Sequence, residues 1–79
     1  MREKLLEVLT DIRPDVDFEN ERLLMDGGIL DSFDIIAIVQ EMRDIFSVNI
    51  DADDLEPYNF NTVDGMLEMI RAHRQSEGK

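Results

Sequence analysis

The chain has no cysteine and no tryptophan, and it has one histidine and two prolines among its 79 residues. The absence of cysteine excludes a disulfide, and a single histidine without cysteine excludes a Cys/His metal site. A chain of fewer than about 80 residues must then be held together by tight packing of its elements. Hydrophobic residues make up 43% of the sequence, enough for one small core. We treat residues 1–79 as a single domain.

Basic residues are also scarce: there are 8 Lys+Arg against 19 Asp+Glu, and the net charge is -11. Nucleic acids and anionic membrane surfaces are bound through Lys and Arg, so the composition argues against both as partners and favours a basic protein surface. No apolar run approaches the roughly 20 residues of a membrane span, and the first residues lead into an amphipathic pattern rather than a signal core. We expect a monomeric, cytoplasmic protein that does not insert into membranes.

Three long segments, about residues 2–12, 32–46 and 62–74, carry apolar residues at helical spacing. Their apolar stripes are Leu5, Leu6, Val8, Leu9 and Ile12; Ile35, Ile38, Val39, Met42, Ile45 and Phe46; and Val63, Met66, Leu67 and Ile70. Pro14 ends the first segment because the residue before a proline avoids helical geometry. Asn61 or Thr62 is expected to cap the last helix, and residues 75–79 are expected to fray.

The connections are less regular. A loop of 19 residues, 13–31, is long for a compact domain and therefore suggests a function. Its expected anchors are Phe18, Leu23, Leu24, Ile29 and Leu30, with one possible helical turn over residues 20–25. A short third helix is predicted over residues 50–56, capped by Asp51 and ended by Pro57, and the aromatic Tyr58 and Phe60 anchor the connector after it. The sum is an all-α antiparallel bundle of three main helices plus one short helix, with a long first loop.

Ser32 stands where the long loop ends and the second helix begins. Serine at this position is commonly an N-cap, but Asp31 can serve equally well, and Ser32 would then be the first helical residue with its hydroxyl in solvent. A hydrolytic triad is excluded because the only histidine, His73, lies near the far end of the last helix. The acids from Asp51 onward do not form an EF-hand loop. Its fifth, sixth and twelfth positions hold Leu55, Glu56 and Thr62.

The outer face of the second helix carries apolar residues next to Ser32. At 100° per residue, the side opposite the core stripe presents Phe33, Ile36, Ala37, Gln40 and Asp44. An apolar cluster on this side is either a docking patch or a surface covered by the long loop. Residues 31–56 also hold eight acidic residues and one basic residue, like the polar rim of a transient interface. We expect partner docking at Ile36, Ala37, Gln40, Asp44, Asp53 and Asp54.

Asp31-Ser32-Phe33-Asp34 at the start of an amphipathic helix, after a long loop and within an acidic segment, resembles the acyl carrier protein family. The Gly28-Ile29-Leu30-Asp31-Ser32 run, with glycine four residues before the serine, is similar to the D-alanyl carrier type, as is the segment Asp54–Thr62. Three positions depart from fatty-acid carriers. Phe33 replaces the usual leucine or methionine, Ala37 replaces an acid, and Gln40 replaces an apolar residue. These departures favour a dedicated set of partners.

The resemblance implies that a phosphopantetheinyl transferase attaches 4'-phosphopantetheine from coenzyme A covalently to Ser32, making a phosphoprotein, and that it recognises Asp31 and Phe33. Cargo would be held as a thioester, loaded by an adenylating ligase and passed to a downstream acyl transferase. The carrier itself would have no catalytic residue and no metal. The first expectation for the cargo is D-alanine or another small acid. The alternatives are a stand-alone acyl carrier in lipid, polyketide or peptide assembly, and an unmodified acidic helical adaptor.

Overall fold

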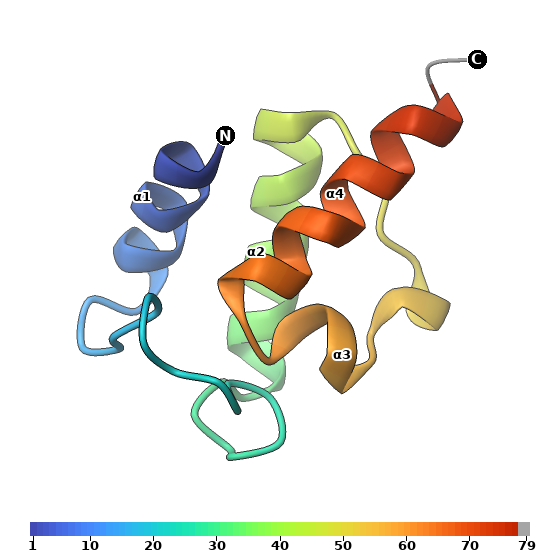
Figure 1. Ribbon diagram of the computed structural model, residues 1–79. Coiled ribbons are helices and arrows are strands. Elements are labelled where there is room, and N and C mark those ends of the chain that lie inside the picture. Colours follow the sequence, from blue (N-terminus) through green and yellow to red (C-terminus); the bar gives the residue numbers. More distant parts are fainter. Residues whose placement is uncertain (78–79) are drawn as a thin grey trace.

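A computed structural model describes residues 1–77, with side chains through Arg74. It contains four α-helices, which are α1 (Arg2–Ile12), α2 (Ser32–Phe46), α3 (Pro57–Phe60) and α4 (Val63–Glu77), and a 3-10 turn, η1 (Ala52–Asp54) (Figure 1). There is no strand among residues 1–77. The prediction of an all-α fold is confirmed.

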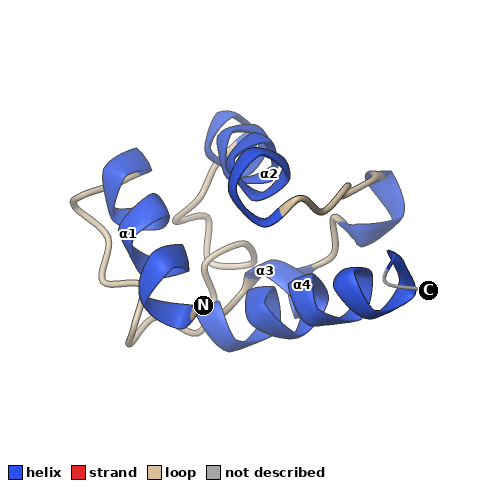
Figure 2. Ribbon diagram, turned by 90° about the horizontal axis from the view of Figure 1, so that it is seen from above, coloured by secondary structure: helices blue, strands red, loops and turns tan. Residues whose placement is uncertain are grey.

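The helices surround one core. In Figure 1, α1 and α2 run in opposite directions, and α4 passes obliquely in front of α2. Seen from above, α1 lies at one side of both α2 and α4, and α3 leads directly into α4 (Figure 2). The long loop, the first turn of α2 and α3 all lie at the same end of the molecule (Figure 1). This end therefore brings Ser32 together with segments that are distant in the sequence.

The core contains only apolar side chains, and no polar or charged residue is buried in the described part of the chain. Its members are Leu5, Val8 and Leu9 of α1; Phe18, Leu24 and Leu30 of the loop; Ile35, Ile38, Met42 and Phe46 of α2; Val48; Phe60 of α3; and Val63, Met66, Leu67, Met69 and Ile70 of α4. Because the core includes three residues of the long loop, packing holds that loop against the helices.

The predicted boundaries of α1 and α2 are confirmed. The short third helix predicted over residues 50–56 is wrong, because only Ala52–Asp54 form a 3-10 turn. Pro57 begins α3 instead of ending a helix, since the first helical position needs no N–H partner and suits the fixed φ of proline. The last helix is longer than predicted and continues to Glu77, so the fraying expected from residue 75 is not seen up to that point. Residues 78–79 lie outside the described range.

Three apolar residues expected to be buried are exposed instead: Leu23, Ile45 and Tyr58. Tyr58 and Phe60 are two residues apart on one helix, about 200° around its axis, so only one of them can face the core. Phe60 takes that position. In the loop, Leu24 is buried and the adjacent Leu23 is exposed. Ile45 lies at the edge of the apolar stripe of α2, in the last turn of the helix. Residues 20–25 form no helical turn, because the turn lies over residues 24–28 instead.

Candidate functional site

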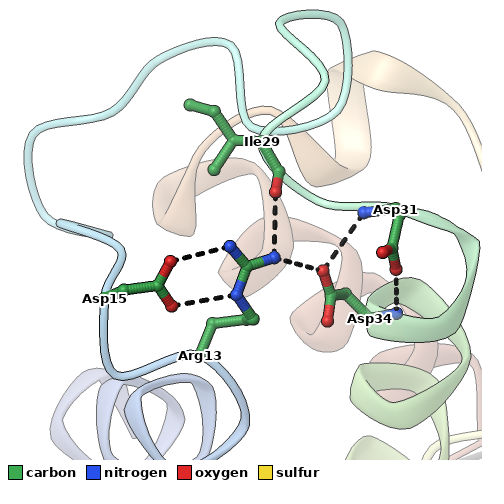
Figure 3. Close-up of polar contacts among 5 residues, drawn as sticks. All are labelled: Arg13, Asp15, Ile29, Asp31 and Asp34. Atoms are coloured by element: carbon green, nitrogen blue, oxygen red, sulfur yellow. Dashed lines mark hydrogen bonds and ion pairs between the residues drawn. The ribbon is translucent and has the colours of Figure 1, made fainter.

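Asp31, not Ser32, caps α2. Asp31 Oδ1 accepts a hydrogen bond from the Asp34 N–H at 2.9 Å, and Asp34 Oδ2 accepts one from the Asp31 N–H at 3.2 Å (Figure 3). This reciprocal capping box satisfies amide donors that have no partner within the helix. Ser32 is therefore the first helical residue, and it is exposed. Its hydroxyl is not needed for capping and is accessible from solvent.

Arg13, directly after α1, binds this capping box from the side. Its Nη1 donates to Asp34 Oδ2 at 2.6 Å and to the Ile29 carbonyl oxygen at 3.1 Å (Figure 3). Its Nε and Nη2 donate to the two carboxylate oxygens of Asp15 at 2.9 and 2.8 Å. One planar guanidinium can make all these bonds because its five donors point in fixed directions. Arg13 thus joins the end of α1, both ends of the long loop and the start of α2.

No sequence pattern marks Arg13 as a site residue. In the sequence it is only the residue before Pro14, where the first helix stops. Its partners at the far end of the loop are Ile29 and Asp34, which are 16 and 21 residues away. No spacing rule for a helix or a turn covers such separations.

The Arg13 guanidinium, by hydrogen bonding, lowers the pKa of the Asp15 carboxyl to about 2, and the two carboxylates raise the pKa of Arg13. The pKa of Asp15 in the folded protein thus lies below its ordinary value of 3.8. The ion pair therefore stabilises the protein above that value, and its contribution is lost as the pH falls towards 2.

We expect an NMR titration of the Asp15 carboxyl carbon to give a pKa near 2. In Arg13→Ala the pKa should rise towards 3.8, while the hydrogen bond from the Asp15 backbone still lowers it. The same pKa in both proteins would contradict the ion pair.

Asn61 holds the second half of the loop against the junction of α3 and α4. Its Oδ1 accepts hydrogen bonds from the N–H groups of Met25 at 3.0 Å and Asp26 at 2.9 Å, and its Nδ2 donates to the Asp26 carboxylate at 3.1 Å. Its backbone carbonyl accepts a further bond from the Leu24 N–H at 3.1 Å. Of the two residues expected to cap α4, Thr62 is the cap: its Oγ1 accepts from the Gly65 N–H at 2.9 Å. Asn61 instead fixes the path of the loop just before Ser32.

Gly28 allows the loop to turn back towards α2. Its φ is +74°, a left-handed conformation that glycine adopts without steric cost. The turn is closed by a hydrogen bond from the Leu30 N–H to the Leu24 carbonyl oxygen at 2.9 Å. Gly28, the residue on which the resemblance to the D-alanyl carrier type rests, is thus explained in this chain by the turn of the loop.

The apolar patch beside Ser32 is open to solvent. Phe33 is 82% exposed and Ile36 is 55% exposed, so the alternative in which the long loop covers them is wrong. Ala37 is half-buried, and the prediction that it lies on the fully exposed face needs this correction. Gln40 is exposed.

A groove runs between α2 and the segment that contains η1. A pocket of about 350 Å³ next to Ser32 is lined by Met25, Leu30, Asp31, Ser32, Ile35, Ile36 and Leu55. A second pocket of about 300 Å³ follows α2 and is also lined by Ile35, Ile36 and Leu55. Leu55, which the sequence analysis did not place at the site, thus forms the wall opposite Ile36.

The acids expected to bind partners have different surroundings. Asp44 and Asp53 are exposed. Asp54 is half-buried, and its Oδ2 lies 2.9 Å from Nε2 of His73 and 3.2 Å from the Asp51 backbone N. Asp44 is twelve residues along α2 from Ser32, about 18 Å at 1.5 Å per residue. The predicted docking residues therefore do not gather at Ser32, but are spread along α2 and over η1.

No model of a known protein family matches the chain, and no curated protein matches it. Among the side chains described, those of residues 1–74, no group of three His, Asp or Glu is arranged to hold a metal ion. None of the described helices is long and apolar enough to cross a membrane.

Proposed function

We propose that this protein is a carrier that bears 4'-phosphopantetheine on Ser32 and holds an acyl or aminoacyl group on it as a thioester. The observation that carries the proposal is the exposed Ser32 hydroxyl on the first residue of α2, left free because Asp31 and Asp34 cap the helix. The Ser32 oxygen is therefore available to form a bond to another group.

The surroundings of Ser32 fit a phosphopantetheine group. The start of α2 carries the partial positive charge of the helix dipole, which favours a phosphate. The pocket next to Ser32 has a mainly apolar lining, which suits the aliphatic part of such an arm. When bound, the group supplies a thiol for thioester formation, and the chain has no cysteine of its own. The chain contributes the Ser32 oxygen, which forms a bond to phosphorus as the bond to the nucleotide part of coenzyme A breaks.

The surface around Ser32 supports transfer between partner enzymes. Exposed Phe33 and Ile36 lie within a turn of Ser32, and acidic side chains follow the same helix and the facing segment. A small apolar centre with a charged rim is typical of transient interfaces. The partners we propose are a phosphopantetheinyl transferase, an adenylating ligase and an acyl transferase with basic docking surfaces. The site of action would be the cytoplasm, where coenzyme A is available.

The cargo we propose is a small aminoacyl group, with D-alanine as the first candidate. Two sequence features support this cargo. The Gly28–Ser32 run is similar to the D-alanyl carrier type, and Phe33, Ala37 and Gln40 differ from the residues typical of fatty-acid carriers. A carrier of this kind serves one dedicated ligase rather than a fatty-acid synthase.

The test is incubation of the protein with coenzyme A and a phosphopantetheinyl transferase of broad specificity, followed by intact mass measurement. We expect a gain of one phosphopantetheinyl group. An unchanged mass would contradict the carrier function and favour an unmodified acidic adaptor. The modified protein is then given ATP, D-alanine and an adenylating ligase of the D-alanyl type, and in parallel a fatty-acyl ligase with its substrate. Loading with a fatty acyl group only would contradict the aminoacyl cargo.

Removal of the exposed apolar side chains should weaken binding to the transferase without unfolding α2. We expect Phe33→Ala and Ile36→Ala each to raise the KM for the carrier by about tenfold, the cost of losing one central contact of an interface. Ile45→Ala is the matched control, because this exposed isoleucine is on the same helix but at its other end. Circular dichroism should show equal helical content in all three variants. A KM equal to that of the wild type for both patch variants would exclude the patch from the interface.

A further inference from the structure

The proposed function does not use Arg13, yet this residue has the most extensive polar contacts near Ser32. Its Nη1 binds Asp34 Oδ2 and the Ile29 carbonyl, and both groups belong to the short stretch around the start of α2. The Asp34 side chain is only 13% exposed, while Asp15, on the other side of the guanidinium, lies largely in solvent. Arg13 therefore binds its inner partners where water competes poorly.

Asp34 takes part in both hydrogen bonds of the capping box, and both depend on its position. Its carboxylate accepts the Asp31 N–H, and its own N–H is bound by Asp31. If Arg13 were absent, a mostly buried carboxylate would lose its cation, and rotation of Asp34 into water would open the capping box. The first turn of α2, which begins with Ser32, would then lose its fixed geometry.

Arg13 also changes the balance of charge near Ser32. A phosphate group that approaches Ser32 is attracted by the N-terminus of α2 but repelled by the carboxylates of Asp31 and Asp34. Arg13 offsets one of these negative charges at 2.6 Å, and it does so from the side of α1. The contact to the Ile29 carbonyl also fixes the chain three residues before Ser32.

We infer that Arg13 is a positioning residue for the modification of Ser32. It acts through Asp34 and Ile29, holding the first turn of α2 so that the Ser32 hydroxyl meets the phosphate of coenzyme A in one orientation. The inference rests on the proposed function. Positioning of a reacting group acts on the chemical step more than on the encounter, so the effect should be on kcat.

The kinetic test compares Arg13→Ala, Arg13→Lys and Arg2→Ala as substrates of the same transferase. We expect about a tenfold lower kcat for Arg13→Ala, with the KM for the carrier changed less than about twofold. Arg13→Lys should recover part of the loss, because an ammonium can pair with Asp34 but cannot reproduce the bidentate contact with Asp15 and the bond to Ile29. Arg2→Ala is the matched control: it removes the same charge and an α1–α4 ion pair, with Asp64, and should leave kcat unchanged.

A second readout does not depend on the modification. The Ile35 N–H donates the first backbone bond of α2, to the Asp31 carbonyl oxygen at 3.0 Å. We expect amide hydrogen exchange at Asp34 and Ile35 to be about tenfold faster in Arg13→Ala, with Met42, in the middle of α2, unchanged. If the wild type itself takes no phosphopantetheine, the proposed function fails, and exchange alone decides whether Arg13 orders this turn. Equal acceleration along all of α2, an effect on KM alone, or a kcat equal to that of the wild type would overturn the inference.

Discussion

Ser32→Ala is expected to abolish phosphopantetheine attachment completely and to leave stability almost unchanged. The substitution removes the side-chain oxygen to which we propose that the group is bonded. It removes no cap, because Asp31 and Asp34 already form the capping box, and an exposed substitution of this kind changes the free energy of unfolding by no more than about 0.5 kcal/mol. Intact mass measurement and urea unfolding on the same preparation test both halves of the prediction.

Two control variants separate the roles of neighbouring residues. Asp31→Ala should cost about 1 kcal/mol of the free energy of unfolding, the usual value of an N-cap. Ser47→Gly changes the serine at the other end of α2, where φ is +58° and glycine is well tolerated, and it should be modified like the wild type. If Ser32→Ala were destabilised as much as Asp31→Ala, the Ser32 hydroxyl would have a structural role that the capping box does not predict. A mass gain that persisted in Ser32→Ala would place the attachment elsewhere.

Phe60→Ala is expected to cause a large loss of the stability of the protein. Phe60 is fully buried in the four-residue helix α3, and truncation of a buried phenylalanine costs about 3–5 kcal/mol. A chain of this length has roughly 4–12 kcal/mol of stability in total, at about 0.05–0.15 kcal/mol per residue. With neither disulfide nor buried ion pair among the described residues, this core has no other strong support.

Tyr58→Ala provides a control on the same helix. Tyr58 is 73% exposed, so its loss should change the free energy of unfolding by no more than about 0.5 kcal/mol. Urea unfolding followed by circular dichroism gives both values, and at equal unfolding slopes the midpoints can be compared directly. Similar losses in the two variants would mean that the two side chains share the core, contrary to their orientations in the structure.

Phe60 also connects the core to the site. It precedes Asn61, which binds the N–H groups of Met25 and Asp26 and so fixes the loop that leads to Ser32. On the opposite side, Arg13 binds the same loop at Ile29. The segment that leads to α2 is therefore held by Arg13, directly after α1, and by Asn61, at the junction of α3 and α4. A swinging carrier needs a mobile arm, but the residue to which the arm is attached can remain rigid.

Local patterns were sufficient for most of the architecture. The periodicity of apolar residues gave the bounds of α1 and α2, and Pro14 marked the end of the first helix. The pattern on the outer face of α2 also predicted that Phe33 and Ile36 lie beside Ser32, because residues on one helix have a fixed angular relation. The same patterns failed at Pro57, since a proline is compatible with both the end and the first position of a helix.

By itself, therefore, the sequence determined the three long helices, which face of each is apolar, and that Ser32 opens the second of them, but it did not place the short helix α3. These features depend on neighbours within about one helical turn. The structure showed that Asp31 rather than Ser32 is the cap, a local choice between two neighbouring residues that the sequence left open. Only the tertiary structure decided that the loop leaves Phe33 uncovered, and that Arg13 and Asn61 hold the loop across separations of 16 and 36 residues. Contacts of that kind form where packing of the core brings the segments together, and no local pattern encodes them.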